Sequence, residues 1–181
     1  MSSKYLLSLD GGGVREIATV IFLSKLEKEI GKPPFEQFDF FVGTSAGAIT
    51  AMAISVAKMS GEGLMNLWSE ENLERILEAS MWDSRLGLMQ TNPKYDGAGK
   101  KDVLGEYFGN LKLGEAYKKV AVMSYDIEKR EPILLTSYDD PNISLVDAGS
   151  ATSAAPIYYP TAKVGDRYLI DGGIVANNPV L

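Results

Sequence analysis

The spacing of apolar and polar positions divides the first part of the chain into short strands and helices. The apolar runs at 5–9 and 38–42 end at polar or glycine-rich turns, which predicts two buried strands. From Ile17 to Ile30 apolar residues recur with helical spacing, and a glycine and two prolines directly afterwards end that helix. A small, apolar helical segment follows the second strand at 46–59. This order of strand, helix, strand and helix is typical of a parallel sheet covered by helices.

The rest of the chain continues with elements of both kinds. The expected elements are an amphipathic helix at 64–79, an irregular stretch at 81–102, a short helix at 103–108, strands at 120–124 and 133–136, a helix at 145–154 and a hairpin at 162–170. Gly165-Asp166 is a favourable two-residue hairpin turn. Because no repeat, low-complexity tract or linker interrupts this order, we expect one α/β domain spanning 1–181.

Composition and charge narrow the class of protein. Hydrophobic residues make up 45% and charged residues 23% of the chain, as in soluble globular domains. The net charge of −6 argues against nucleic acid as a partner and gives no general attraction to an anionic membrane. No apolar run reaches the roughly 20 residues that span a bilayer, and the N-terminus carries no secretory signal. We therefore expect a soluble, cytoplasmic protein, although an effector exported without a cleavable signal has the same features.

Two residue types are absent, and their absence restricts the chemistry. Without cysteine the chain has no disulfide, no thiolate metal site and no cysteine nucleophile. Without histidine it has neither a Ser-His-Asp triad nor a histidine-based zinc site. A serine nucleophile in this chain must therefore be activated by a carboxylate or a lysine.

The stretch that bears most on chemistry is Gly43-Thr44-Ser45-Ala46-Gly47, between the second strand and the second helix. A strand, Gly-x-Ser-x-Gly and a helix form the layout of a nucleophile elbow. The two glycines allow a sharp turn without Cβ clashes, and the turn lifts Ser45 Oγ above the sheet at the positive end of the helix. Ser45 is therefore predicted to be a catalytic nucleophile rather than an ordinary turn serine.

Two further glycine-rich turns follow predicted strands. Gly11, Gly12 and Gly13 stand between the first strand and the first helix, where their N–H groups can converge on an oxyanion or a phosphate. Asp171 ends the hairpin strand and precedes two glycines. Besides the serine, the chain therefore offers backbone N–H donors and a carboxylate at the ends of predicted strands.

Two glycine-rich stretches invite comparison with nucleotide-binding motifs, and each lacks a required residue. The third glycine of a dinucleotide-binding loop is replaced by Glu16. In the P-loop-like stretch 97–101, Lys101 stands where serine or threonine is required, and Lys94 occupies the first glycine position. Neither stretch predicts a nucleotide site.

Together the motifs resemble the patatin-like phospholipases, a family of acyl hydrolases that use a Ser-Asp dyad and no histidine. The family pattern is Asp-Gly-Gly-Gly-x-Arg-Gly, then Gly-x-Ser-x-Gly, then Asp-Gly-Gly or Asp-Gly-Ala, and it corresponds to residues 10–16, 43–47 and 171–173. The stretches 151–160 and 177–179 also look like family sequence. The resemblance implies a three-layer α/β fold with a mainly parallel central sheet and helices on both faces.

The resemblance also implies a function, a lipid acyl hydrolase of the phospholipase A or lysophospholipase type. Ser45 is expected to form an acyl-enzyme, and Asp171 to accept the serine proton and later activate water. The expected oxyanion-hole donors are the N–H groups of Gly11, Gly12, Gly13 and Ala46. No metal or cofactor is expected. The expected partners are phospholipids, lysophospholipids or other acyl esters, with transient contact to a membrane or micelle and none with nucleic acid.

Several positions leave alternatives open. Glu16 stands where the family has glycine, and the chain ends at Leu181 where family members continue, so the domain is either compact or C-terminally short. The alternative function is a weak or inactive domain that serves lipid binding or protein interaction. Arg15 either supports the oxyanion loop, binds a lipid phosphate or pairs with Glu16. Asp10 is expected to order the glycine loop rather than react, and apolar residues of 81–102 either form an acyl funnel or lid, or pack in the core.

Overall fold

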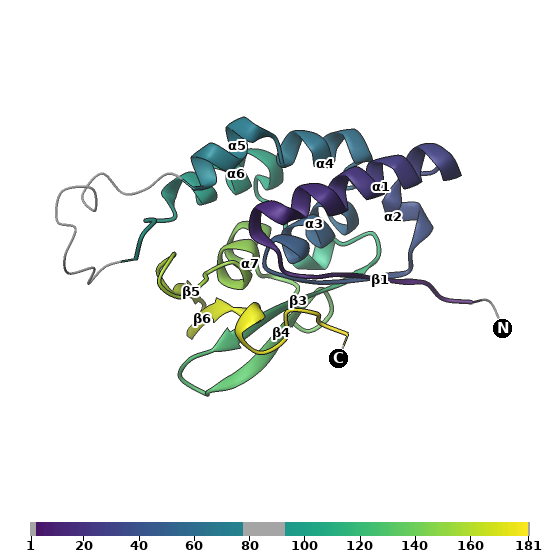
Figure 1. Cartoon of the computed structure of the whole chain (residues 1–181). Helices are drawn as coiled ribbons and strands as arrows, with labels where there is room; N and C mark the ends of the chain where they lie inside the picture. The colour runs from purple at the N-terminus through teal and green to yellow at the C-terminus, as the bar shows by residue number, and fades with distance from the viewer. Residues whose placement is uncertain (1–2, 78–92, 181) are drawn as a thin grey trace.

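The structure is a computed structural model that describes residues 3–77 and 93–180. Among these residues, six strands form one sheet: β1 (Leu6–Leu9), β2 (Phe40–Thr44), β3 (Lys119–Asp126), β4 (Glu131–Thr136), β5 (Ala162–Val164) and β6 (Arg167–Asp171). β1, β2 and β3 are adjacent and parallel, whereas β4 and β6 pair antiparallel with β3, and β5 pairs antiparallel with β6. The expected α/β class with a parallel sheet centre is confirmed (Figure 1).

Most helices agree with the expected pattern apart from their limits, but the short helix at 34–37 was not predicted. They are α1 (Glu16–Ile30), α2 (Pro34–Gln37), α3 (Ala46–Ser55), α4 (Gly61–Leu67), α5 (Glu70–Ile76), α6 (Ala98–Phe108) and α7 (Leu145–Thr152). The helix expected at 64–79 is two helices, because Ser69 accepts a hydrogen bond from Asn72 N–H and starts a new one. The helix expected from 103 begins at Ala98, while most of the irregular stretch, 81–92, lies outside the described residues. No described helix is long and apolar enough to cross a membrane.

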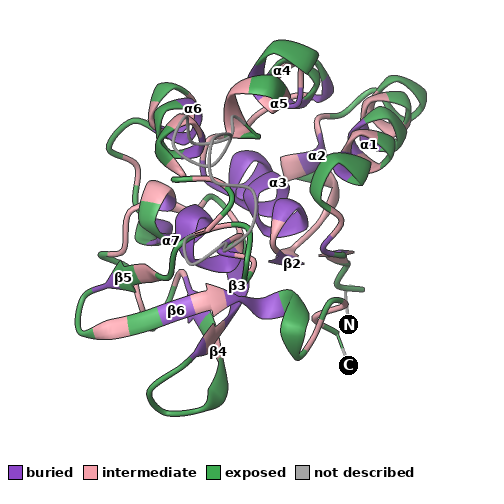
Figure 2. Ribbon diagram, turned by 60° about the vertical axis from the view of Figure 1, so that its left-hand side comes forward, coloured by how far each residue is buried: buried purple, intermediate pink, exposed green. Residues whose placement is uncertain are grey.

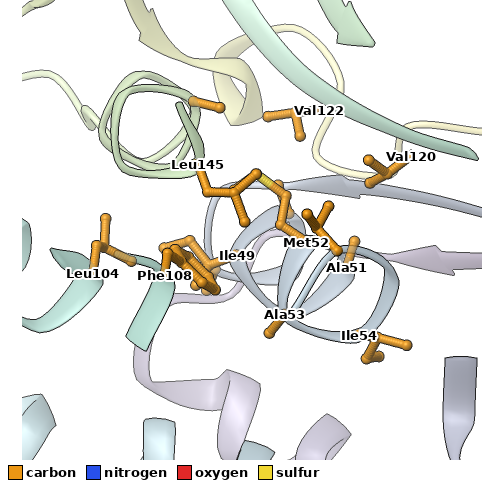
Figure 3. Close-up of a cluster of buried hydrophobic side chains, with 14 of the residues drawn as sticks. Ile49, Ala51, Met52, Ala53, Ile54, Leu104, Phe108, Val120, Val122 and Leu145 are labelled. Atoms are coloured by element: carbon orange, nitrogen blue, oxygen red, sulfur yellow. The ribbon is translucent and has the colours of Figure 1, made fainter. Parts of the chain in front are cut away.

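The core is built around α3. All ten of its residues are buried, because α3 lies between the sheet and the outer helices α1 and α4 (Figure 2). Its small and apolar side chains contact residues of β3 and of α6 and α7, among them Val120, Leu104 and Leu145 (Figure 3). A largely apolar helix is what a position between two layers requires.

The helices lie on one face of the sheet, where we expected them on both (Figure 1). The strand order β1-β2-β3 never reverses direction, and right-handed crossovers taken in one direction place successive helices on the same side. Among the described residues, the C-terminal segment covers part of the opposite face, while Leu6 and Leu134 on that face are exposed. There Thr44 Oγ1 donates a hydrogen bond to Ala176 O at 2.9 Å, and Gly172 packs against Met123.

The register on β3 brings two distant parts of the chain together. β4 runs along one edge of β3, and the other edge is shared end to end by β2 and β6. Thr44, the last residue of β2, pairs with Met123, and Asp171, the last residue of β6, pairs with the next residue, Ser124. The turn after β2 and the end of β6 therefore meet at one point of the sheet.

Candidate active site

Ser45 occupies a strained turn between β2 and α3. Its φ of 54° and ψ of −124° lie in a region that non-glycine residues rarely adopt. The turn is held from α7, because Ser45 N–H donates to Thr152 Oγ1 at 2.9 Å and the Thr152 hydroxyl donates to Met123 O at 2.5 Å. A Cβ on Gly47 would overlap the carbonyl oxygens of Leu9 and Asp10, so this position must be glycine for α3 to approach the end of β1.

Ser45 and Asp171 face each other directly. Ser45 Oγ donates a hydrogen bond to Asp171 Oδ2 at 2.7 Å, and Asp171 Oδ1 accepts one from Gly173 N–H at 2.7 Å. Both carboxylate oxygens are thus fixed, and one of them is within proton-transfer reach of the serine. Across the described ranges, no group of three or more carboxylates gathers where a metal ion would bind.

The protonation of Asp171 reflects opposing influences. The side chain is 7% exposed, and burial raises its pKa above the usual range for aspartic acid. The hydrogen bonds from Gly173 N–H and Ser45 Oγ and the positive charge of Lys100 oppose this rise. A carboxylate with a raised pKa is a stronger base than an exposed one, provided that it remains ionised.

The glycine loop lies beside Ser45, and Asn177 holds it there. Gly11 N–H donates to Asn177 O and Asn177 Nδ2 donates to Gly11 O, both at 3.0 Å. A Cβ on Gly11 would lie 2.5 Å from Asn177 Oδ1 and 3.4 Å from Ser45 Cβ, so a larger residue here would displace the Asn177 side chain. In the described part of the chain the N–H groups of Gly12, Gly13 and Ala46 have no protein partner, which leaves them available to a ligand.

A cavity of about 310 Å³ opens onto these groups. Ser45, Asp171 and the three glycines line it. Its remaining wall is largely apolar and includes Ile49, Trp68, Leu73, Ile76 and Leu77. An apolar cavity with a few convergent polar groups suits a ligand that carries a hydrocarbon chain.

The charged residues that flank the glycine loop, Asp10, Arg15 and Glu16, do not all lie as expected. Arg15 lines the cavity and its Nε donates to Gly12 O at 3.4 Å, and the pair that we considered with Glu16 is not among the ion pairs of the described residues. Glu16 turns inward instead and is 2% exposed; burial raises its pKa to about 7, against the opposing effect of the Thr50 and Thr19 side chains. Asp10 is exposed and makes no side-chain hydrogen bond within the described ranges, so Asn177, rather than Asp10, orders the loop.

The sequence did not reveal three residues of this site. Thr152 and Asn177 lie in stretches that look like family sequence, yet nothing in their spacing indicates a contact with Ser45 or Gly11. Lys100 lines the cavity and is 4% exposed. A lysine next to Lys101 in a glycine-rich stretch has the sequence signature of a solvent-exposed residue, so no local signal marks it as buried.

Comparison with known proteins assigns the family. The family model described as "Patatin-like phospholipase" matches residues 7–181. Patatin-like protein 4 of Arabidopsis thaliana is 33% identical over 200 residues that include 97% of this chain and 50% of that protein. A cGAMP-activated phospholipase of Pseudomonas aeruginosa is 32% identical, over 98% of this chain and 54% of that protein. The chain spans about half the length of these curated relatives.

Two solved structures share the fold. VipD from Legionella pneumophila superposes with a TM-score of 0.66 over 96% of this chain and 47% of that one, at 16% identity. The type III effector protein ExoU superposes with a TM-score of 0.52 over 87% of this chain and 40% of that one, at 14% identity. At these identities the comparison concerns the fold alone.

Proposed function

Because the chain belongs to the patatin-like phospholipase family, we propose that it is a lipid acyl hydrolase of the phospholipase A or lysophospholipase type that works through a Ser-Asp dyad. The observation that carries the proposal is the 2.7 Å hydrogen bond from Ser45 Oγ to Asp171 Oδ2. Ser45 has no histidine to activate it, and this carboxylate is the base within reach of its hydroxyl.

The first half of the reaction forms an acyl-enzyme. Ser45 Oγ attacks the ester carbonyl carbon while its proton passes to Asp171 Oδ2. The carbonyl oxygen becomes an oxyanion, for which we assign the unpaired N–H groups of Gly12, Gly13 and Ala46 as donors. Gly11 supports the loop, because its N–H is already bonded to Asn177. The intermediate then expels the alcohol, which takes the proton from Asp171.

The second half returns the free enzyme. Asp171 accepts a proton from water as the water oxygen attacks the acyl carbonyl, and the same donors hold the new oxyanion. Collapse releases the fatty acid, and Asp171 returns the proton to Ser45 Oγ. Each donor of this kind lowers the barrier by roughly 3 kcal/mol in comparable sites. Because an aspartate is a weak base, the backbone donors supply much of the catalysis.

The cavity supports acyl esters as the substrate class. The acyl chain lies along the apolar wall formed by Ile49, Trp68 and Leu73, where its burial excludes water from the dyad. Arg15, which is exposed and lines the cavity, is our candidate for contact with a lipid phosphate. Protein groups carry out every step of this scheme, so we expect the hydrolysis to be metal-independent.

Hydrolysis of p-nitrophenyl esters of increasing chain length, measured with EDTA present, tests the proposal. We expect turnover by the wild type and a loss of at least about a thousandfold in kcat/KM in Ser45→Ala and in Asp171→Asn. Asp166→Asn, the same substitution in the exposed turn of the same hairpin, should leave turnover unchanged. Thermal unfolding of each variant checks that the fold is retained.

Three results would contradict parts of the proposal. If Asp171→Asn retained turnover, the proposed role of the dyad would be contradicted. If EDTA abolished turnover, the proposed metal independence would be contradicted. A folded wild type that hydrolyses neither these esters nor phospholipids would favour the alternative, a domain with a binding role.

A further inference from the structure

Lys100 places a buried positive charge in the wall of the cavity that holds Ser45 and Asp171. The side chain is 4% exposed, although lysine is almost never buried to this extent without a carboxylate partner. Its Nζ instead donates to Ser153 O at 3.0 Å and lies 3.6 Å from the centre of the Tyr159 ring. These contacts leave the ammonium group within the site rather than in solvent.

The surrounding elements fix this position. A Cβ on Gly99 would overlap the carbonyl of Arg75, so the start of α6 lies directly against the end of α5. Tyr159, whose ring faces Lys100, is itself held by a 2.8 Å hydrogen bond from its hydroxyl to Ile76 O. Lys100 is therefore held in place from α5, from the end of α7 and from the segment that follows α7.

The charges around Lys100 couple it to the dyad. Burial lowers the pKa of Lys100 to about 7, while the carboxylate of Asp171 opposes that fall and Lys101 adds to it. The ring of Tyr159 stays uncharged at neutral pH, because burial raises its pKa to about 12. Asp147 of α7 lines the adjoining surface cavity beside Lys100, and its carboxylate accepts a hydrogen bond from Ser144. Asp171 lines the same cavity as Lys100, and its carboxylate is the negative charge that acts on the buried ammonium group.

We propose that Lys100 is a positioning residue of this site, whose ammonium group keeps Asp171 in the ionised form that can accept the Ser45 proton. The inference rests on the proposed dyad function. The burial of Asp171 in this largely apolar cavity favours a neutral carboxylic acid, which cannot act as the base. A nearby cation favours the carboxylate, and the absence of a direct ion pair leaves both oxygens of Asp171 free for Ser45 and Gly173.

A purely structural role for Lys100 predicts something different. In that case Lys100 would only join α6 to Ser153 O, and a neutral donor of similar size would replace it. Lys100→Gln keeps a donor and removes the charge, whereas Lys100→Met removes both and keeps the volume. Lys101→Met removes the same charge from the exposed neighbour on the same helix and is the matched control.

The test is the pH profile of kcat/KM with an uncharged p-nitrophenyl ester. In Lys100→Gln and Lys100→Met we expect the acidic limb to move up by about one pH unit, a loss of about tenfold below the limb that is recovered at higher pH. Lys101→Met should leave the limb in place, because exposed charges are screened. A uniform loss at all pH values with an unmoved limb would overturn the proposal.

A measurement on the wild type is independent of whether the variants fold. The ¹³C carboxyl resonance of Asp171, assigned with Asp171→Asn, should titrate once with its own proton and again near pH 7 as Lys100 loses its proton. A single step would overturn the proposal. A wild type without esterase activity that still shows both steps would contradict the proposed function while retaining the coupling.

Discussion

At the scale of single residues, the Thr152 hydroxyl holds two backbone groups in the interior. It accepts from Ser45 N–H and donates to Met123 O, and the side chain is fully buried. Thr152→Val keeps the shape and leaves both groups unpaired, which we expect to cost about 2 kcal/mol of unfolding free energy. Because the strained turn loses its tether, kcat should fall while KM changes little.

Urea unfolding and steady-state kinetics measure the two effects of Thr152→Val. Thr161→Val, the same substitution at an exposed position before β5, serves as the control and should change neither quantity. A loss of stability with an unchanged kcat would mean that Thr152 supports the fold and not the geometry of Ser45.

At the scale of elements, the elbow depends on how closely α3 approaches the end of β1. A side chain at Gly47 meets the carbonyls of Leu9 and Asp10, and these backbone atoms cannot move aside as a side chain can. We expect Gly47→Ala to displace α3, to lower the unfolding free energy by about 1–3 kcal/mol and to reduce kcat/KM at least about tenfold. Denaturant unfolding and ester hydrolysis provide both measurements.

The control for Gly47→Ala is Gly105→Ala, in the middle of α6. Open space surrounds the position where its Cβ would lie, so the substitution should raise the unfolding free energy by about 0.5–1 kcal/mol through helix propensity alone. A Gly47→Ala variant as stable and active as the wild type would show that α3 need not lie against β1.

The elements that could be predicted from the sequence are those that depend on residues close together in it. The hairpin around Gly165-Asp166 and the strand, serine turn and helix around Ser45 were predictable, because each depends on residues a few positions apart. The break at Ser69 was missed because apolar residues continue with helical spacing on both sides of it. The serine followed by Glu70 and Glu71 is a helix-start signal that would have located the break.

At the scale of the whole molecule, the register of the strands determines contacts that local sequence patterns do not predict. Ser45 and Asp171 are each visible in the sequence, but they meet because β2 and β6 share one edge of β3. The pairing of β6 with β3 is long-range, and no spacing within either strand encodes it. The burial of Lys100 is a similar case, since it follows from how α5, α6 and α7 pack together and not from its neighbours in sequence.

The stability of the whole molecule should depend on pH through Glu16. This residue lies at the start of α1 beside Thr50 of α3, whose hydroxyl accepts a hydrogen bond from Trp68. Its pKa rises from 4.5 to about 7 on folding, so the folded state binds more protons than the unfolded state between these values. The stability linked to Glu16 is thus fully present below about pH 4.5 and is lost as pH rises through 7. Glu16→Gln, which carries no charge, should be more stable than the wild type at pH 8 by up to about 3 kcal/mol and no more stable at pH 4.

Urea unfolding at several pH values measures this difference. Glu29→Gln, on the exposed side of α1, is the control, and its unfolding free energy should follow that of the wild type at each pH. An advantage of Glu16→Gln that stays constant from pH 4 to 8 would mean that the pKa of Glu16 is the same in the folded and the unfolded protein. If instead the advantage grows with pH, the carboxylate at the position where the family has glycine costs stability at neutral pH. Full esterase activity in Glu16→Gln would further separate that cost from the chemistry of the neighbouring glycine loop.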